Sequence, residues 1–430
     1  MTSPERVLVV GAGQAGTELA ISLRDNGFTG AIVLVGCEQG QPYQRPPLSK
    51  DFLTGEIDER ALLFRGTDFW HNHGIDLISG ERILTASMDA TGRGVGITGQ
   101  GRRVEFDRLA LATGARPRRL TVPGSNLDGV AYLRDLRDAR SLRRRMLQAN
   151  RVAVIGGGFI GLEAAAVCRG QGKAVTVLEV ADRLMERSVA PVVSEFYRSA
   201  HTERGVDVLL SAEVTAIRGS DGRVTGVHLA DGSVIDADLV LVGIGVIPRT
   251  ELAEQLGLDC DGGIVVDELA RTSRPGVVAA GDCTVQPHPL TGDGLVRLES
   301  VQNAVSQAKL AAPSLIGRAA RPADVPWFWS DQYDLKLQIA GLTRGYDQLV
   351  VRGDPGTSRF SVVYYRGGRL TGVDAVNAPA DYLVVRQALK AGVSLPAEAV
   401  ADASVPMRSL LAPPQQLRHN GMTFNARSRP

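Results

Sequence analysis

The feature that most constrains how this chain can fold is a short motif that occurs twice. Residues 6–16 read RVLVVGAGQAG and residues 151–161 read RVAVIGGGFIG, so each is a short apolar run that ends in Gly-x-Gly-x-x-Gly. An apolar run of this length predicts a buried strand, and the helical spacing of Leu19, Ala20 and Leu23 behind the first turn predicts a helix. The sequence therefore predicts the same strand–turn–helix unit twice.

Each unit carries the residue types that bind a dinucleotide. Glycine lets the backbone turn sharply and approach a pyrophosphate, and the N-terminus of the following helix offers unpaired N–H groups to it. A second apolar run follows each helix, and just past it stands an acid, Glu38 or Glu179, that can accept hydrogen bonds from a ribose. We interpret the units as two dinucleotide sites, with turn glycines Gly11, Gly13, Gly16, Gly156, Gly158 and Gly161.

Two dinucleotides in one chain are economical if one stays bound while the other exchanges. Nicotinamide gives up electrons as a hydride, whereas a flavin accepts a hydride and releases electrons singly or in pairs, so we expect resident FAD and exchanging NADH. A carboxylate at Glu179 favours a free ribose 2′-hydroxyl and repels a 2′-phosphate, which predicts a preference for NADH over NADPH. Arg183, four residues further on, could weaken that preference.

Composition argues against several other classes of protein. The formal net charge is +1, so no overall field attracts nucleic acid or anionic lipid, and neither is expected as a partner. No apolar run reaches the roughly 18 residues that span a bilayer, and MTSPER leads at once into a strand, without room for a signal peptide, so we expect a cytoplasmic protein. The four cysteines form no C-x-x-C pair and the six histidines show no metal spacing, so no metal or iron–sulfur site is expected.

Five further segments resemble the FAD-dependent NADH:ferredoxin reductases that serve bacterial cytochromes P450 and ring-hydroxylating dioxygenases. The resemblance runs from about residue 6 to about residue 411. Paired glycine turns are common to many flavoproteins, whereas RPPLSK combined with PWFWSDQ is far more specific to this group. The segments are YQRPPLSK (43–50), LALATGARPR (109–118), VVAAGDC (277–283), RLESVQNAVSQA (297–308) and PWFWSDQY (326–333).

The expected fold class is α/β, with two Rossmann-like dinucleotide-binding domains as in glutathione reductase and a small α+β C-terminal domain. At 430 residues, two or three domains are expected. The predicted FAD-binding domain is discontinuous, 1–114 and 245–320, and is interrupted by an NAD-binding domain at 115–244. The C-terminal domain is predicted at 321–411, with strand-like stretches followed by a helix at 381–391, and the proline-rich 412–430 is predicted to be a flexible tail.

The resemblance implies FAD on the first unit and NADH on the second. It gives the FAD pyrophosphate to Gly11, Gly13 and Ala15, a ribityl hydroxyl to Asp282, and the flavin pyrimidine edge to the backbone N–H of Val301. Many members have Asp-Glu or a lone Asp where this chain has Cys37–Glu38, so Glu38 would bind the ribose alone, or the register differs by one residue. The remaining cofactor contacts that it implies are Gly16, Arg45, Pro47, Ile83, Ala112, Thr113, Gly114, Arg134 and Trp329 for FAD, and Ile160 and Gly245 for NADH.

Two ionisable residues are the candidates for the catalytic centre. The resemblance implies that Lys50 lies beside the isoalloxazine ring, where a cation stabilises negative charge, and that Glu163 lies near both rings and pairs with Lys50. Pro46–Pro47 would hold Lys50 on a rigid segment. The alternative is that Lys50 and Glu163 are separate surface residues. Trp329 would lie at the far side of the flavin, near a docking electron acceptor, and packing between domains is the alternative for Trp327 and Trp329.

The expected function is NADH-dependent reduction of an acidic [2Fe–2S] ferredoxin, which docks transiently and supplies a cytochrome P450 or other oxygenase; a monomer is expected. Residues 321–430 carry 13 Lys and Arg against 9 Asp and Glu, and the expected docking residues are Arg297, Lys390 and Arg408. A flavin NADH oxidase or disulfide reductase is one alternative, but residues 40–50 lack the redox cysteine that it needs. A rubredoxin-type reductase and a non-enzymatic signalling flavoprotein are the others, and the last would be strongly basic.

Overall fold

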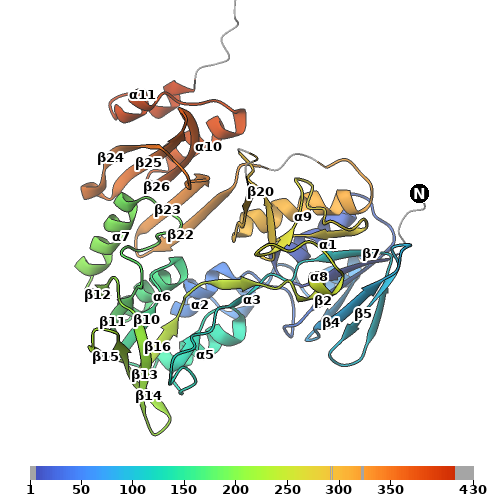
Figure 1. The fold of residues 1–430 in the computed structure, drawn as a ribbon, viewed down its shortest axis with the longest axis horizontal. Helices are drawn as coiled ribbons and strands as arrows, with labels where there is room; N and C mark the ends of the chain where they lie inside the picture. The colour runs from blue at the N-terminus through green and yellow to red at the C-terminus, as the bar shows by residue number, and fades with distance from the viewer. Residues whose placement is uncertain (1–5, 291, 293, 321–323, 412–430) are drawn as a thin grey trace, which may run out of the picture.

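A computed structural model describes residues 6–290, 292, 294–320 and 324–411 (Figure 1). Within these residues the chain forms three five-stranded sheets and several smaller ones. Two of the large sheets are parallel and carry helices, and the third is antiparallel and belongs to the C-terminal part, so the predicted α/β class is confirmed. The predicted tail at 412–430 lies outside the described residues.

The first parallel sheet has the strand order β19-β7-β1-β2-β3. Its central strand β1 (Arg6–Val10) lies between β2 (Ala31–Gly36) and β7 (Arg108–Leu111), and the outer strands are β3 (Ile75–Ser79) and β19 (Val277–Ala279). Helices α1 (Gln14–Asp25) and α9 (Val301–Leu315) cover one face, and Leu19, Ala20 and Leu23 are fully buried there as the helical spacing predicts. An antiparallel sheet of β4 (Ile83–Met88), β5 (Gly94–Thr98) and β6 (Arg103–Phe106) covers the other face.

The second parallel sheet repeats this plan in the order β12-β11-β10-β16-β9. Its strands are β9 (Val130–Tyr132), β10 (Arg151–Ile155), β11 (Ala174–Leu178), β12 (Val206–Leu209) and β16 (Leu239–Val242). Helices α5 (Leu136–Met146), α6 (Phe159–Gly170) and α7 (Pro191–Glu203) pack on one face. The antiparallel strands β13 (Val214–Ser220), β14 (Arg223–Leu229) and β15 (Val234–Asp236) cover the other.

A short two-stranded ribbon joins the two parallel sheets. Strand β8 (Ala115–Pro117) pairs in antiparallel fashion with β17 (Val246–Pro248), so the chain leaves the first sheet and returns to it through neighbouring strands. The predicted limits of the inserted domain, residues 115 and 244, lie at or beside this ribbon.

The C-terminal sheet has the order β22-β23-β26-β25-β24 and lies between two helical layers. Its strands are β22 (Trp327–Gln332), β23 (Leu335–Gly341), β24 (Gln348–Asp354), β25 (Arg359–Arg366) and β26 (Arg369–Val376). One face packs on α10 (Pro379–Ala391), α11 (Ala397–Ala401) and η3 (Met407–Leu410). The other face shares a core with α6 and α7, so this sheet is bound to the inserted domain rather than free of it (Figure 1).

The remaining elements are short and connect the larger ones. They are η1 (Pro46–Ser49), α2 (Asp51–Thr54), α3 (Glu59–Leu62), α4 (Asp68–Asn72), α8 (Glu251–Gln255), β18 (Ile264–Val265), β20 (Thr284–Pro287), β21 (Leu295–Val296) and η2 (Pro355–Thr357). Segment 46–54 matters most for the site, because η1 and α2 contact α6 of the second unit.

Candidate cofactor and electron-transfer site

The first glycine turn has the geometry that a bound pyrophosphate requires. Gly11 has a φ of +111°, and a Cβ atom added there would lie 2.1 Å from the carbonyl oxygen of Ala112, so only glycine fits. A Cβ added at Gly16 would lie 1.7 Å from the carbonyl oxygen of Gly11, because the helix packs closely against the strand end. A Cβ at Gly13 would meet no atom within 4 Å. The open space at Gly13, directly before α1, is where a phosphate can approach.

The second turn repeats this geometry position by position. Gly156 has a φ of +108°, and an added Cβ would lie 2.5 Å from the carbonyl oxygen of Gly243. At Gly161 it would lie 2.1 Å from the carbonyl oxygen of Gly156, and at Gly158 it would meet nothing within 4 Å. Ile160 is 46% exposed at the start of α6, an unusual position for a large apolar side chain. The second turn therefore also leaves open space and an apolar contact for a ligand.

The acid of the second unit is fixed by backbone groups. Glu179 accepts hydrogen bonds from the N–H of Gly157, at 2.6 Å, and from that of Ala181, at 2.9 Å. Arg183 instead donates to the carbonyl oxygens of Val189 and Glu186, at 2.8 and 2.6 Å, and to a serine hydroxyl. The guanidinium group is thus engaged by its own loop, which leaves the carboxylate as the charge beside the turn.

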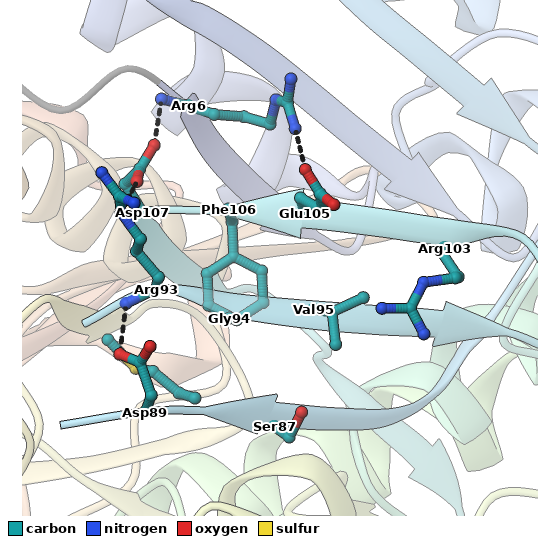
Figure 2. Close-up of a pocket in the computed structure, with 11 residues that line it drawn as sticks. Arg6, Ser87, Asp89, Arg93, Gly94, Val95, Arg103, Glu105, Phe106 and Asp107 are labelled. Carbon is teal, nitrogen blue, oxygen red and sulfur yellow. Dashed lines mark hydrogen bonds and ion pairs between the residues drawn. The ribbon is translucent and has the colours of Figure 1, made fainter. Parts of the chain in front are cut away.

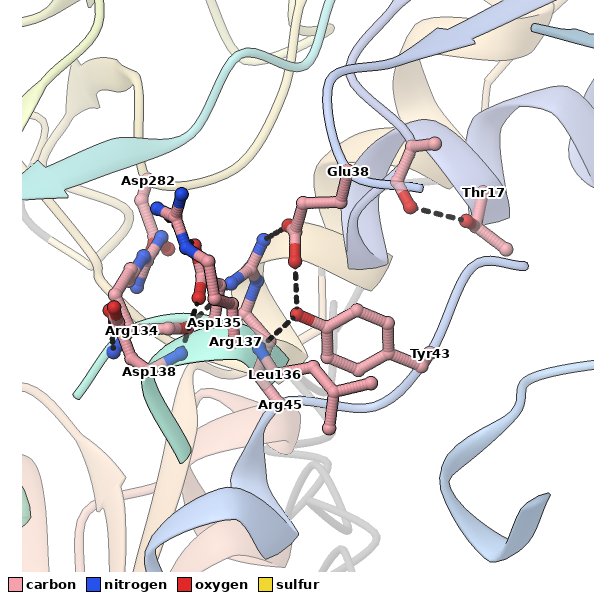
Figure 3. Close-up of polar contacts among 11 residues, drawn as sticks. Thr17, Glu38, Tyr43, Arg45, Arg134, Asp135, Leu136, Arg137, Asp138 and Asp282 are labelled. Atoms are coloured by element: carbon pink, nitrogen blue, oxygen red, sulfur yellow. Dashed lines mark hydrogen bonds and ion pairs between the residues drawn. The ribbon is translucent and has the colours of Figure 1, made fainter. Parts of the chain in front are cut away.

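The acid of the first unit is fixed by side chains. Glu38 accepts hydrogen bonds from the hydroxyl of Tyr43 and from the guanidinium of Arg45, as Figure 3 shows. Burial raises the pKa of the Tyr43 hydroxyl well above its ordinary value, so this group remains a donor. Tyr43 also accepts from the N–H of Leu136 at 2.8 Å, and Arg45 donates to the carbonyl oxygen of Arg134 at 2.5 Å. Segment 43–45 therefore ties Glu38 to the start of α5.

Asp282 and Arg134 close the same side of the first unit. They form an ion pair at 2.9 Å, with the Arg134 and Asp282 side chains 26% and 20% exposed. The neighbouring Gly281 lies against the first turn, since a Cβ added there would be 3.1 Å from that of Ala15. Val301 is the first residue of α9, where backbone N–H groups have no acceptor within the helix. The residues expected to hold FAD thus gather around one turn.

Lys50 and Glu163 meet between the two units. The Nζ atom of Lys50 lies 2.7 Å from Oε2 of Glu163, and the hydroxyl of Ser49 donates to the same oxygen at 2.6 Å. Glu163 is 2% exposed and Lys50 17%. The pair predicted from the sequence is therefore present, and the alternative of two separate surface residues is wrong. Sequence reasoning missed Ser49 and Ser330, which also donates to Glu163, because a lone serine gives no pattern.

The two tryptophans of β22 have different surroundings. Trp327 packs against the core under α10, near Tyr382 at 6.5 Å between ring centroids, with Arg386 over its ring. Trp327 thus packs within the C-terminal domain, and the alternative of packing between domains is wrong for this residue. Trp329 is only partly buried, and its ring lies 5.7 Å from that of Trp327. Ser330, on the opposite side of the strand, points toward α6.

The other residues named from the sequence border the same region. Ile83 and Ala112 are buried, so their side chains belong to the core. Thr113 donates to the carbonyl oxygen of Arg249 at 2.7 Å.

Gly114 and Gly245 both have positive φ, and Cβ atoms added there would face guanidinium groups of Arg134 and Arg187. Pro47 lies in the first turn of η1. Arg187, in the loop beyond Glu179, is a candidate that no sequence signal identified.

The expected docking residues do not form one free basic surface. Arg297 pairs with Glu299 at 2.7 Å, and Lys390 lies 3.4 Å from Asp324. Arg408 is exposed on η3, which contacts the helix that carries Lys390. Local carboxylates therefore offset two of the three charges.

One cavity among the described residues lies away from this site. It has a volume of about 740 Å³ and lies on the sheet of β4, β5 and β6, at the opposite end of β1 from Gly11 (Figure 2). Arg6 pairs with Glu105 at 3.4 Å and Arg93 with Asp107 at 3.6 Å, so two of the three arginines that line it face carboxylates of the same cavity. Among the described residues, no three His, Cys, Asp or Glu side chains gather in a way that could hold a metal ion, and no helix is long and apolar enough to cross a membrane.

Comparison with known proteins identifies the family. A model described as pyridine nucleotide-disulphide oxidoreductase matches residues 5–308, and one described as reductase C-terminal matches residues 327–411. The chain belongs to the pyridine nucleotide-disulphide oxidoreductase family. Like other members of this family, it is an oxidoreductase that uses FAD and NAD(P)H. Three features fit these two cofactors: the open glycine turn of each unit, the acid of each unit (Glu38 or Glu179), and the Arg134–Asp282 ion pair.

Several members of the family match nearly the whole chain. Rhodocoxin reductase from Rhodococcus erythropolis is 47% identical over 406 residues, which are 94% of each protein. The ferredoxin reductase for the CYP199A2 system from Rhodopseudomonas palustris is 43% identical, with a TM-score of 0.90 over 95% of this chain and all of the other. A covalent putidaredoxin reductase–putidaredoxin complex contains a chain 40% identical, with a TM-score of 0.90, over 94% of this chain and 98% of the other.

Proposed function

We propose that the protein is an NADH-dependent ferredoxin reductase. In this proposal electrons pass from NADH to bound FAD and then singly to a [2Fe–2S] ferredoxin, which supplies a cytochrome P450 or another oxygenase. The observation that carries the proposal is the ion pair of Lys50 and Glu163, which lies between two glycine turns of equal geometry. The relatives named above are reductases of rhodocoxin, of a ferredoxin and of putidaredoxin, and one was crystallised in a covalent complex with putidaredoxin.

The residues divide between the two cofactors by unit. Gly11, Gly13 and Asp282 would hold FAD, and Gly156, Gly158 and Glu179 would hold NADH. Bound FAD would supply the capacity to accept a hydride from NADH and to release electrons one at a time. Lys50 supplies a positive charge at the junction, and Glu163 holds that charge in place through the 2.7 Å contact. Hydride transfer needs two rings held face to face, which a fixed junction between the units favours.

The position of the cysteines favours a separate electron carrier over an internal disulfide. All four are free; Cys37 is exposed at the end of β2, and Cys168 and Cys283 are buried. Burial raises the pKa of the Cys283 thiol, and the charge of the neighbouring Asp282 raises it further, so this thiol is not a ready nucleophile. Segment 43–50, which carries Lys50, has no cysteine. These features disfavour a disulfide reductase and a peroxide-reducing NADH oxidase.

The proposal extends to the electron acceptor, the oligomeric state and the cellular location of the protein. An acidic [2Fe–2S] ferredoxin would dock near the edge of the flavin, where the first unit meets the C-terminal sheet, with Trp329 close by. We also propose that the protein acts as a monomer and that it works in the cytoplasm, where NADH is generated. A rubredoxin is the second candidate carrier, because the same flavin could reduce it.

The test is to purify the protein and measure which carrier it reduces. We expect one FAD per chain, bleaching of the flavin by NADH under anaerobic conditions, and rapid NADH-driven reduction of a [2Fe–2S] ferredoxin followed by its visible absorbance. A rubredoxin is assayed in parallel. Faster reduction of rubredoxin would replace the proposed carrier, and a folded protein that binds no flavin would contradict the whole assignment.

A further inference from the structure

A chain of buried hydrogen bonds continues from Glu163 on the side opposite Lys50. The hydroxyl of Ser330 donates to Oε1 of Glu163 at 2.7 Å, and Nε2 of Gln332 donates to that hydroxyl at 3.2 Å. Oε1 of Gln332 lies 2.9 Å from Nε2 of His201. The exposed fraction is 2% for Glu163 and 0% for the other three. The chain thus runs from α6 through β22 of the C-terminal sheet to α7 without reaching water.

The hydrogen bonds of this chain all point the same way. Because the amide nitrogen of Gln332 donates to Ser330, its carbonyl oxygen must accept, and His201 donates from Nε2–H. Burial lowers the pKa of His201, so the ring is neutral and its Nδ1 is an acceptor for the Tyr333 hydroxyl, 3.3 Å away. Each donor is therefore oriented toward Glu163. Hydrogen bonds donated to a carboxylate favour its charged form.

The charged and titratable groups around Glu163 come from the segment around η1, from β22 and from α7. Lys50 is the cation in contact with it, and Ser49 and Ser330 are the hydroxyl donors. From α7, the buried phenol of Tyr197 has a raised pKa, caused by burial and then by the charges of Asp331, Asp374 and Glu163. At the far end Arg204 lies over the ring of Tyr333 and lowers the pKa of His201 further. One lysine and two hydroxyls thus stabilise a carboxylate that is almost fully buried.

We propose that Ser330, Gln332 and His201 are positioning residues that hold Glu163 as a carboxylate throughout the redox cycle. FAD bound at this junction would take two electrons and one proton from NADH as a hydride, and the negative charge added would lie near that of Glu163. A buried carboxylate in that situation relieves the repulsion by taking up a proton, unless donors fix its charged form. With the chain in place, Glu163 takes up none and keeps Lys50 in position. The inference rests on the placement of FAD at this junction and not on the identity of the electron acceptor.

The test is the pH dependence of the midpoint potential of bound FAD, measured from pH 6 to pH 9. One proton taken up with two electrons gives a slope of about 30 mV per pH unit, which we expect for the wild-type protein. In Ser330→Ala, Glu163 takes up a second proton on reduction, so the slope rises toward about 59 mV per pH unit in part of the range. A reduced-minus-oxidised infrared difference spectrum should then show a new protonated-carboxyl band, which Glu163→Gln in the same background removes.

Conservative and matched variants separate this role from simple packing. Ser330→Thr keeps the hydroxyl and should keep the wild-type slope, whereas Gln332→Met and His201→Phe interrupt the chain and should steepen it less than Ser330→Ala. Ser361→Ala is the matched control, because Ser361 is fully buried on β25 of the same sheet and donates to Asp381 at 2.9 Å. Its slope should equal that of the wild type.

Two results would overturn the inference. One is a wild-type slope near 59 mV per pH unit together with a protonated-carboxyl band in the wild-type difference spectrum, because Glu163 would then be a proton acceptor. The other is an unchanged slope, with no carboxyl band, in Ser330→Ala. If Ser330→Ala loses its flavin, Gln332→Met takes its place in this comparison and an unchanged slope there has the same meaning. Yellow protein that NADH bleaches, in every variant compared, shows that the cofactor assignment itself has not failed.

Discussion

The two nucleotide-binding units have the same turn but hold their ligands differently. At equivalent positions of the turns, Ala15 is 6% exposed in the first unit and Ile160 is 46% exposed in the second. Glu38 is held by the side chains of Tyr43 and Arg45, which reach α5 of the other domain, whereas Glu179 is held by backbone groups of its own neighbourhood. Both turns leave open space for a ligand, but only the acid of the first is tied through side chains to a distant segment of the chain. On this basis we propose that the first turn holds the resident cofactor and the second the exchanging one.

The contact that joins the units should show the largest effect. Lys50→Met leaves the buried Glu163 without its cation, which should lower the free energy of unfolding by about 3–5 kcal/mol. Glu163→Gln should cost less, because the partly exposed Lys50 keeps access to water. The double variant should be more stable than Lys50→Met alone, as a double-mutant cycle in urea would show. Strictly additive losses would mean that the pair does not couple the two units.

The two acids should affect different properties. Glu179→Ala removes the charge that repels a 2′-phosphate, so the preference for NADH over NADPH in kcat/KM should fall by on the order of a hundredfold, equivalent to about 2–3 kcal/mol. The change should occur mainly in the KM for NADPH, because the repulsion acts on binding of the 2′-phosphate. Arg183 does not offset this repulsion, since its guanidinium is engaged by its own loop. Glu38→Ala should leave this preference unchanged and weaken FAD retention instead. An unchanged preference in Glu179→Ala would contradict the ribose assignment.

The two open glycines give a matched pair for the same comparison. A Cβ at Gly13 or Gly158 would meet no protein atom, so both alanine variants should fold and only the ligand should be affected. Gly13→Ala should be purified with little FAD, whereas Gly158→Ala should stay yellow and show a KM for NADH raised about tenfold, or about 1.4 kcal/mol. Gly66→Ala and Gly170→Ala, also in open space, are controls. Loss of FAD in Gly158→Ala would reverse the assignment of the units.

The sequence was most informative where the backbone itself is constrained. The glycine turns, the strands before them and the buried face of α1 could be predicted because a positive φ, a close approach and an apolar period each restrict residue type. Lys50 and Glu163, 113 positions apart, could be paired only through a family resemblance. The chain through Ser330, Gln332 and His201 could not be predicted, because its members come from two domains and each residue type is ordinary in a buried contact. Long-range polar contacts of this kind depend on how the sheets dock.

The smallest effect is expected at the surface, where charges are screened by water and salt. Arg297 and Lys390 already face carboxylates, and exposed pairs of this kind contribute about 0–1 kcal/mol, so each residue should add little to docking.

The triple variant Arg297→Glu, Lys390→Glu and Arg408→Glu should slow ferredoxin reduction several-fold at low salt, through the association rate, and the difference should shrink as salt rises. Ferricyanide reduction should be unaffected, because a small dye needs no docking surface. Equal loss of both activities would indicate damage near FAD, and full, salt-sensitive ferredoxin reduction would put the docking surface elsewhere. The buried pair of Lys50 and Glu163 should respond in the opposite way, since salt does not reach it, so its variants should keep the same defect at every ionic strength.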